Sequence, residues 1–184
     1  MMQETPREKS LLVLGGTSDI GRAAAAVYAA AGWSVTLAVR NAEEGARDAQ
    51  DLTVRYGKPV KVVTFDARAV ENHVAFLDRL GAIPDTVICV VGILGDQTRA
   101  ETDLAHAADI LRANFEGPAL LLGEIANRMA ARGRGAIVGV SSVAGDRGRA
   151  VNYVYGSAKA GMTAFLSGLR NRELRILVAT DIAA

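Results

Sequence analysis

Residues 11–21 have the sequence LLVLGGTSDIG, in which an apolar run of strand length passes directly into a glycine-rich turn. The alanine-rich stretch at residues 20–31 is predicted to form a helix that is closed by Gly32. A strand, a glycine turn and a helix in this order present backbone N–H groups at a helix N-terminus, where a phosphate can bind. No Lys-Ser or Lys-Thr pair follows Gly21, which argues against a P-loop triphosphatase and favours a dinucleotide as the ligand.

The turn supplies the first set of candidate cofactor contacts, which are Gly15, Thr17, Ser18, Asp19, Ile20 and Gly21. Gly15 and Gly21 suit a tight turn and close packing of the helix on the strand. Glycines also serve strand-to-helix turns that bind nothing, so the turn alone leaves both interpretations open.

Further apolar runs of strand length alternate with helix candidates along the chain. The strand candidates are residues 35–39, 60–65, 86–91, 136–141 and 174–179, and the helix candidates are residues 70–80, 104–129 with a bend at Pro118, and 155–170. Continuous apolar strands separated by helices are typical of a parallel sheet covered on both faces. We therefore predict an α/β fold, a Rossmann-like doubly wound parallel sheet of about six strands. We expect one domain over residues 1–184, with a polar N-terminal tail at residues 1–10 and an atypical C-terminal segment at residues 173–184.

The composition excludes several classes of function. The 184 residues carry 21 Lys and Arg against 20 Asp and Glu, and this net charge of +1 excludes a nucleic-acid binder that works by bulk positive charge. The single cysteine and two distant histidines exclude an intramolecular disulfide and show no metal-ligand spacing. No apolar run reaches the roughly 18 residues of a membrane span, and residues 1–10 lack the apolar core of a signal peptide. We expect a cytoplasmic protein with no metal site, no nucleic-acid partner and no membrane span.

Residues at the ends of the second and third predicted strands suit the adenosine half of a dinucleotide. Arg40 and Asn41 follow the second strand, where a guanidinium accommodates a 2′-phosphate and an acidic residue would select NAD. We therefore expect NADP, with NAD less favoured, and Arg22 is a second candidate for the phosphate. Asp66 ends the third strand, where the edge of the adenine is expected. Arg40 also fits an ordinary solvated arginine, and Asp66 also fits a helix cap.

A second group of polar residues follows the fifth predicted strand and starts the last helix. Tyr155 and Lys159 are four residues apart and therefore lie on one helical face. A tyrosine hydroxyl has a pKa near 10, so proton transfer at neutral pH needs an adjacent cation, which Lys159 supplies. Ser142 lies at the carboxyl end of a strand, where ligands bind in open α/β sheets, and its hydroxyl is suited to polarise a carbonyl. Its neighbour Ser141 is expected to point to the other face.

Together these residues resemble the classical short-chain dehydrogenase/reductase family from residue 11 to about residue 171. The similarity rests on motifs in family order, Gly15-x-x-x-Asp19-Ile20-Gly21, Phe65-Asp66-Ala67, Asn114, Ser142-Val143-Ala144-Gly145 and Tyr155-Gly156-Ser157-Ala158-Lys159. The resemblance implies an oxidoreductase that transfers a hydride between NADP and a small-molecule carbonyl or alcohol substrate. Residues 92–96 and 152–157 are also similar to decaprenylphosphoryl ribose 2-keto reductases, which reduce a keto-sugar on a polyprenyl phosphate.

The resemblance also implies the roles of individual residues. Tyr155 would be the general acid for carbonyl reduction and the base in the reverse direction, and it is also an expected cofactor contact. Lys159 would lower the pKa of Tyr155 and hold the nicotinamide ribose. Ser142 would orient the carbonyl. Asn114 would distort its helix to hold a water that relays protons to Lys159, although a buried helix asparagine bonded to a backbone carbonyl fits it too. A homodimer or homotetramer is implied as well.

Three departures from the family pattern raise further expectations. Asp19 replaces a glycine of the turn and would bring a carboxylate near the pyrophosphate unless it caps the following helix. Cys89-Val90-Val91-Gly92 stands where the family has Asn-Asn-Ala-Gly, so Cys89 is expected to be a buried small hydrophobe. Gly92 and Ala67 still join the expected cofactor contacts. After Arg172 the family pattern is lost, so we expect an atypical or truncated C-terminus and, as the alternative function, a catalytically weak dinucleotide-binding or oligomerising module without a substrate lid.

Overall fold

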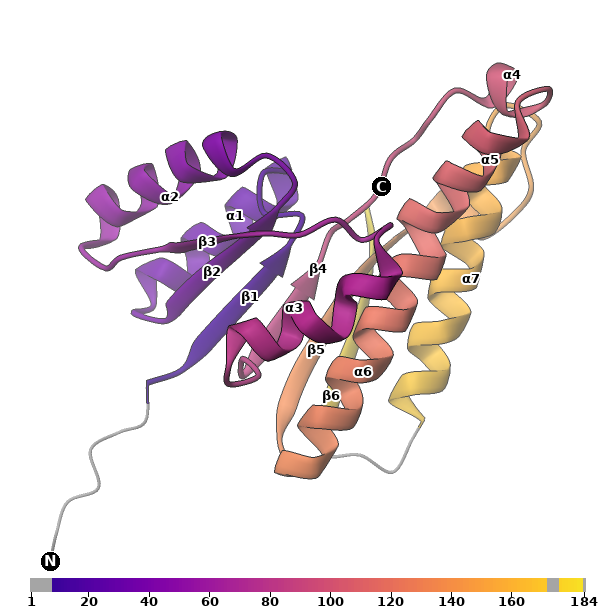
Figure 1. The fold of residues 1–184 in the computed structure, drawn as a ribbon. Coiled ribbons are helices and arrows are strands. Elements are labelled where there is room, and N and C mark those ends of the chain that lie inside the picture. Colours follow the sequence, from indigo (N-terminus) through magenta and orange to yellow (C-terminus); the bar gives the residue numbers. More distant parts are fainter. Residues whose placement is uncertain (1–7, 172–175, 184) are drawn as a thin grey trace, which may run out of the picture.

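A parallel sheet forms the centre of the computed structural model, which describes residues 8–171 and 176–183. Within these residues the sheet has six strands, β1 (Ser10–Leu14), β2 (Ser34–Val39), β3 (Lys61–Thr64), β4 (Thr86–Cys89), β5 (Gly135–Ser142) and β6 (Ile176–Ala183). They lie in the order β3-β2-β1-β4-β5-β6, and each neighbouring pair is parallel (Figure 1). The predicted doubly wound sheet of about six strands is confirmed. The chain reverses its direction of winding between β1 and β4, which leaves a crevice at the carboxyl ends of these two strands.

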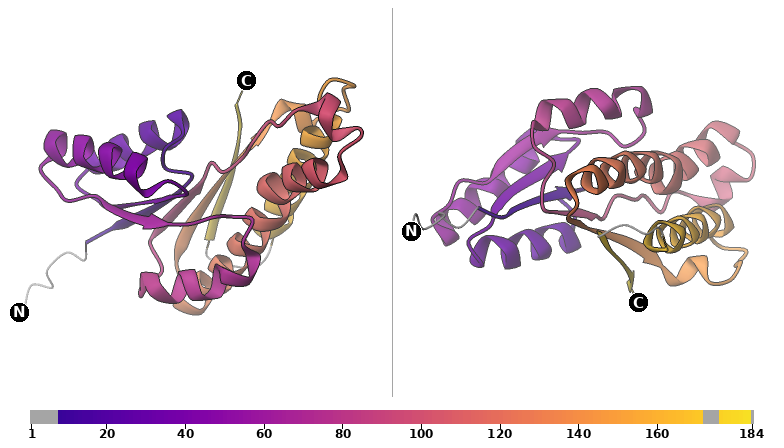
Figure 2. Two further views of the ribbon diagram at one scale, coloured as in Figure 1. Left: turned by 45° about the horizontal axis from the view of Figure 1, so that its top comes forward. Right: turned by 90° about the horizontal axis from the view of Figure 1, so that it is seen from below.

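Helices cover both faces of the sheet (Figure 2). They are α1 (Asp19–Ala30), α2 (Ala42–Tyr56), the 3₁₀ turn η1 (Val70–Asn72), α3 (His73–Leu80), α4 (Gln97–Ala100), α5 (Leu104–Leu111), the π-helical η2 (Arg112–Glu116), α6 (Gly117–Arg132), the 3₁₀ turn η3 (Val143–Gly145) and α7 (Tyr153–Arg170). In the described part of the chain, no helix is long and apolar enough to span a membrane. A cytoplasmic location stays a prediction.

The core lies in two layers, one on each side of β1. Residues 11–14 are fully buried. Leu12 and Leu14 pack in one cluster with residues of α3, α6 and α7, whereas Leu11 and Val13 pack in a second cluster with residues of α1 and α2. Because both faces of β1 are buried, the glycine turn starts from a strand whose position is fixed by packing.

The helix predicted over residues 104–129 is interrupted just before Pro118 by the π-helical segment η2. Proline has no N–H, so Pro118 cannot bond the carbonyl of Asn114 four residues earlier. The N–H of Gly117 instead donates to the carbonyl of Arg112, five residues back, and the side chain of Asn114 donates to the carbonyl of Ile110 at 2.8 Å. The predicted distortion of the helix at Asn114 is therefore observed, as a single π-helical turn.

Further differences from the predicted elements lie at α2 and near both ends of the described residues. Residues 42–56, for which no helix is predicted, form α2, a mainly polar helix that buries little besides Gly45, Ala49 and Leu52. Of the predicted polar tail, residues 1–7 lie outside the described residues, and Ser10 already belongs to β1. Residues 173–175 and 184 of the predicted C-terminal segment lie outside them too, whereas residues 176–183 pair in parallel with β5.

We expect Gly117→Ala and Gly123→Ala, both in α6, to change stability in opposite directions. A Cβ at Gly117 would overlap the backbone carbonyl of Ala67, which should lower the free energy of unfolding by roughly 1–3 kcal/mol. A Cβ at Gly123 would meet only the ring of Phe165, at 3.7 Å, so the ordinary gain of roughly 0.5–1 kcal/mol for alanine in a helix should appear. Urea unfolding of both variants tests this, and stabilisation by Gly117→Ala would contradict it.

Candidate active site

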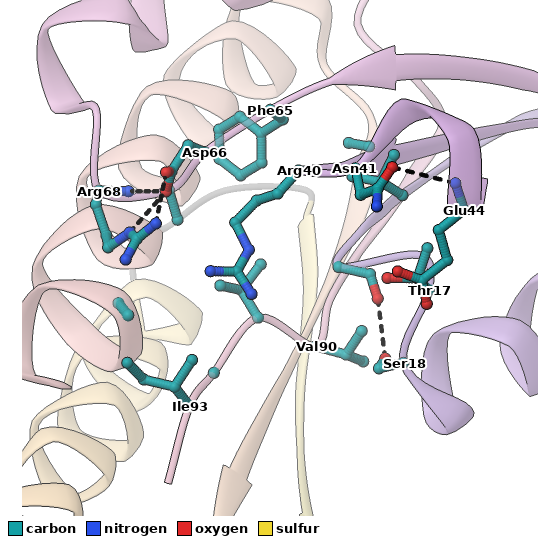
Figure 3. Close-up of a pocket in the computed structure, with 17 residues that line it drawn as sticks. Thr17, Ser18, Arg40, Asn41, Glu44, Phe65, Asp66, Arg68, Val90 and Ile93 are labelled. Atoms are coloured by element: carbon teal, nitrogen blue, oxygen red, sulfur yellow. Dashed lines mark hydrogen bonds and ion pairs between the residues drawn. The ribbon is translucent and has the colours of Figure 1, made fainter. Parts of the chain in front are cut away.

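A pocket of about 230 Å³ opens at the carboxyl ends of β1, β2, β3 and β4 (Figure 3). Eight of the expected cofactor contacts line it, Gly15, Thr17, Ser18, Arg40, Asn41, Asp66, Ala67 and Gly92. The remaining lining residues are Ala38, Val39, Glu44, Phe65, Arg68, Val90, Val91, Ile93 and Ala113. The structure thus brings together residues from four separate strand ends, in the crevice where the winding of the sheet reverses.

The glycine turn is held in one shape by hydrogen bonds and by close packing. Gly15 has φ +87°, which favours glycine, and its N–H donates to the carbonyl of Ala38 at 2.9 Å. The hydroxyl of Ser18 donates to the carbonyl of Gly15 at 2.9 Å and accepts from the N–H of Gly21 at 3.1 Å. A Cβ at Gly21 would lie only 2.7 Å from the carbonyl oxygen of Gly15. The two glycines therefore have a structural role in this turn, and Ser18 is the N-cap of α1.

Besides Tyr155 and Lys159 in α7, three of the expected contacts, Asp19, Ile20 and Gly21, are not among the residues that line the pocket. The side chain of Asp19 is fully exposed and lies 3.6 Å from the guanidinium of Arg22. Asp19 does not cap α1, because Ser18 does so. Its carboxylate faces solvent, and its effect on a pyrophosphate stays a prediction. Contacts of these three residues with a cofactor stay predictions.

Of the two arginines expected near a 2′-phosphate, Arg40 lines the pocket and Arg22 does not. The side chain of Arg40 extends into the pocket (Figure 3). The guanidinium of Arg22 instead hydrogen-bonds to Asp48 at 2.9 Å and to Glu44 at 3.2 Å, and these carboxylates raise its pKa. Asn41 accepts the N–H groups of residues 43 and 44 and so caps α2. Arg40 is therefore the strand-end cation that points into the pocket.

Asp66 is held by a residue that the sequence analysis missed. The guanidinium of Arg68 donates to both carboxylate oxygens of Asp66, at 3.0 and 2.8 Å, and to both oxygens of Asp109 in α5, at 3.1 and 3.2 Å. The backbone N–H of Arg68 adds a third bond to Asp66 at 3.0 Å. These bonds hold the pKa of Asp66 below its usual value and raise the pKa of Arg68. The sequence signal for Arg68 was a cation two residues after the aspartate at the strand end. Its second partner, Asp109 in α5, can be identified only from the fold.

On the other side of the β4 strand end, Gly92, Asn114 and Lys159 converge. Asn114 donates to the carbonyl of Ile93 at 2.7 Å and accepts the N–H of Ile93 at 3.2 Å, so it binds the loop after β4 as well as its own helix. A Cβ at Gly92 would lie 2.7 Å from Oδ1 of Asn114 and 3.2 Å from Nζ of Lys159. Asn114 and Lys159 are both buried. Only glycine, which has no side chain, lets the backbone at residue 92 come this close to the side chains of Asn114 and Lys159.

Lys159 lies under the ring of Tyr155. Its Nζ is 5.7 Å from the centre of that ring and donates to the carbonyl of Val140 at 3.4 Å. Burial lowers the pKa of Lys159. Ser141 bonds to the carbonyl of Lys159 at 3.1 Å and therefore faces α7, as expected. The hydroxyl oxygen of Ser142 accepts the N–H of Ala144 at 3.2 Å, which leaves its own proton free for another acceptor.

Cys89 is 2% exposed, and burial raises the pKa of its thiol. It is the buried small hydrophobe that the sequence predicts.

This arrangement agrees with a family comparison of the sequence. Residues 9–179 match the short chain dehydrogenase family. The chain belongs to this family. Its members are oxidoreductases that use a nicotinamide cofactor and act on small molecules.

Named relatives and solved structures show how far the likeness of this short chain dehydrogenase extends. An uncharacterized oxidoreductase of Mycobacterium tuberculosis is 42% identical over 176 residues, which are 92% of this chain and 70% of the relative. An uncharacterized oxidoreductase of Streptomyces coelicolor is 40% identical over 167 residues, 88% of this chain and 65% of that protein. The crystal structure of a short chain dehydrogenase from Salmonella enterica has a TM-score of 0.85 at 26% identity and covers 95% of this chain and 75% of its own. Actinorhodin polyketide ketoreductase with NADPH has a TM-score of 0.84 at 25% identity, over 97% of this chain and 70% of its own.

We expect Arg68→Met to weaken the fold at neutral pH and to matter less in acid. Because Arg68 lowers the pKa of Asp66, their pairing stabilises the fold above about pH 4, the unfolded pKa of aspartate, and this stabilisation is lost as the pH falls through the folded pKa. Both side chains are about one third exposed, so the loss at pH 7 should be roughly 1 kcal/mol. Urea unfolding between pH 2.5 and 7 measures it. Arg55→Met, which removes the more exposed pair with Asp51, is the matched control and should cost less. A loss for Arg68→Met that does not depend on pH would contradict the interpretation.

Proposed function

We propose that this chain is an NADP-dependent oxidoreductase that transfers a hydride between the nicotinamide and a carbonyl or alcohol substrate, with Tyr155 as the general acid and base. The observation that carries the proposal is the convergence of Gly92, Asn114 and Lys159 beside Tyr155, at the end of a crevice whose other end holds Arg40. The family match and the named oxidoreductases support it. The family match and these relatives favour an oxidoreductase over the alternative of a catalytically weak binding module.

The residues of the crevice fit a dinucleotide. The fixed turn from Gly15 to Ser18 leaves the N-terminus of α1 open to a pyrophosphate. The bare Cα of Gly92 faces Lys159, where the nicotinamide ribose would lie. Asp66 uses three of its about four acceptor positions on Arg68, so one stays available to the adenine edge. When bound, the nicotinamide supplies or takes up the hydride.

The charges at the adenosine end favour NADP over NAD. Glu44 lines the pocket, but Arg22 pairs with its carboxylate. Asp66 is paired with Arg68. The positive charge of Arg40 therefore remains for a 2′-phosphate, which a guanidinium binds through charge-assisted hydrogen bonds.

In reduction, Tyr155 donates its hydroxyl proton to the carbonyl oxygen as the hydride reaches the carbonyl carbon. The ammonium of Lys159 stabilises the phenolate that forms, and its own lowered pKa eases the return of a proton. Ser142 holds its free proton toward the carbonyl oxygen, because its oxygen already accepts the N–H of Ala144. The carbonyl of Asn114, which lacks an N–H from Pro118, is available to hold a relaying water.

The identity of the substrate is the next level of the proposal. The similarity of residues 92–96 and 152–157 to decaprenylphosphoryl ribose 2-keto reductases makes a keto-sugar the first substrate class to assay, beside simple ketones.

We also propose a homodimer or homotetramer. In support, α5 and α6 expose Leu104, Leu111 and Leu120 on the outer side of the helical layer.

We expect NADPH to bind at least about tenfold more tightly than NADH, because charge-assisted bonds to the 2′-phosphate contribute roughly 1.5–3 kcal/mol. Arg40→Asp should reverse this order. Arg47→Asp makes the same change of charge on the exposed face of α2, outside the pocket lining, and should leave the ratio unchanged. Fluorescence titrations of the three proteins measure the dissociation constants. Equal constants for both cofactors in the unaltered chain would refute the preference.

We expect Tyr155→Phe to leave the affinity for NADPH nearly unchanged and to lower carbonyl reduction by at least about 10², the effect of a lost general acid. Lys159→Ala should damage both properties. Tyr153→Phe is the matched control, because Tyr153 is 45% exposed and has Ser157 rather than a lysine four residues later. Steady-state rates on a panel of ketones and keto-sugars test the three variants. Reduction by Tyr155→Phe at the original rate would show that another group supplies the proton.

A further inference from the structure

The helix that carries Tyr155 and Lys159 begins without a cap from its own N-cap residue. The side chain of Asn152 makes no capping bond to α7, and its Oδ1 is buried without a hydrogen-bond partner among the described residues. The first N–H groups of a helix have no acceptor within the helix and need one from elsewhere. Gln97 provides it, because its Oε1 accepts the N–H of Val154 at 3.1 Å. The cap of α7 thus comes from α4, 57 residues earlier in the chain.

Gln97 makes this contact from a backbone that is itself fixed. It is the first residue of α4, whose N-cap Asp96 accepts the N–H of Arg99 at 3.0 Å. The N–H of Asp96 donates to Nε2 of His106 in α5 at 3.0 Å, and Ala100 at the other end of α4 is buried. The loop after β4 is therefore tied to α5 and to the start of α7. A side chain that starts from a fixed backbone can set the position of the group it bonds.

We propose that Gln97 is a positioning residue for Tyr155, a role that rests on the proposed function. Tyr155 directly follows Val154 in the first turn of α7, so the bond from Gln97 holds the turn in which the phenol is placed. Without this bond the N–H of Val154 loses its acceptor and the turn is free to fray, and the phenol loses its fixed place beside Lys159. Gln97 also joins the loop that contains Gly92 to the helix that contains Tyr155.

Two substitutions of Gln97 distinguish the effect of its accepting oxygen from the effect of the rest of the side chain. Gln97→Met keeps the length and removes the acceptor. Gln97→Glu keeps an accepting oxygen and loses only Nε2, which is buried without a hydrogen-bond partner in the described part of the chain. Thr53→Val is the matched control, because Thr53 in α2 likewise accepts one distant backbone N–H, that of Val60, at 3.1 Å, away from the site.

The Met variant should lose at least about tenfold in kcat, because a small misplacement of a reacting group is costly, while the dissociation constant of NADPH stays within about twofold. The Glu variant should keep most of the turnover. Its added negative charge should move the acid limb of alcohol oxidation, where Tyr155 must lose its proton to act as the base, to higher pH, because this charge disfavours the Tyr155 phenolate. Thr53→Val should change neither kcat nor the pH profile.

Amide hydrogen exchange and a spectroscopic titration of Tyr155 test the placement without any turnover. The N–H of Val154 should exchange faster in the Met variant and not in the Glu variant, and the Tyr155 pKa, read by difference from Tyr155→Phe, should rise in the Glu variant. Inactivity of the unaltered chain on all substrates would count against the proposed function, and these two measurements would then decide the role of Gln97. The proposed role of Gln97 would be overturned if Gln97→Met turned over substrate as fast as Thr53→Val. It would also be overturned if the Tyr155 titration did not change in Gln97→Glu.

Discussion

Burial of β1 on both faces is the constraint on which the other features of the site depend. Residues 11–14 are fully enclosed, and each buried leucine contributes roughly 1.5–3 kcal/mol. A slip of the strand by one residue would expose one of these side chains and draw Gly15 into the sheet. The hydrogen bonds of the turn contribute about 1 kcal/mol each, too little to drive such a slip. Packing therefore fixes where the turn begins, and with it the place of the open N-terminus of α1.

A second constraint joins the two ends of the crevice through the interrupted helix of α5 and α6. Pro118 removes one backbone bond, and the side chain of Asn114 takes up the carbonyl of Ile110 while it also holds Ile93 in the loop after β4. One turn further toward the N-terminus of this helix, Asp109 bonds Arg68 and through it Asp66. A single helix thus contacts residues expected at the adenine and residues expected at the nicotinamide. Its irregular turn is part of what brings Asn114 next to Lys159.

Features with a local sequence signal could be predicted, and features made by distant partners could not. The strands, the glycine turn and the pair of Tyr155 and Lys159 follow from apolar runs and short spacings, and the doubly wound parallel sheet follows from the alternation of strands and helices. The cap that Ser18 gives α1 is local, because its partner is the N–H of Gly21 three residues later. The engagement of Arg22 by α2 depends on side chains that only the fold brings near. The bond of Gln97 to Val154 spans 57 residues and has no signature in the spacing. The polar helix α2 was missed because its buried face is narrow.

The proposed preference for NADP depends on which charges around the pocket are already paired, and not on how many arginines the pocket region contains. Arg22 and Arg68 are each bonded to two carboxylates, so each group of one arginine and two carboxylates has a net negative charge. The two arginines thus offset part of the negative charge of Glu44 and Asp66, which otherwise would repel a phosphate from the pocket wall more strongly. Arg40 extends into the same pocket between Asp66 and Glu44 (Figure 3). The proposed contribution of Arg40 to binding a 2′-phosphate therefore depends on Arg22 and Arg68, which offset part of the opposing charge, as well as on its own guanidinium.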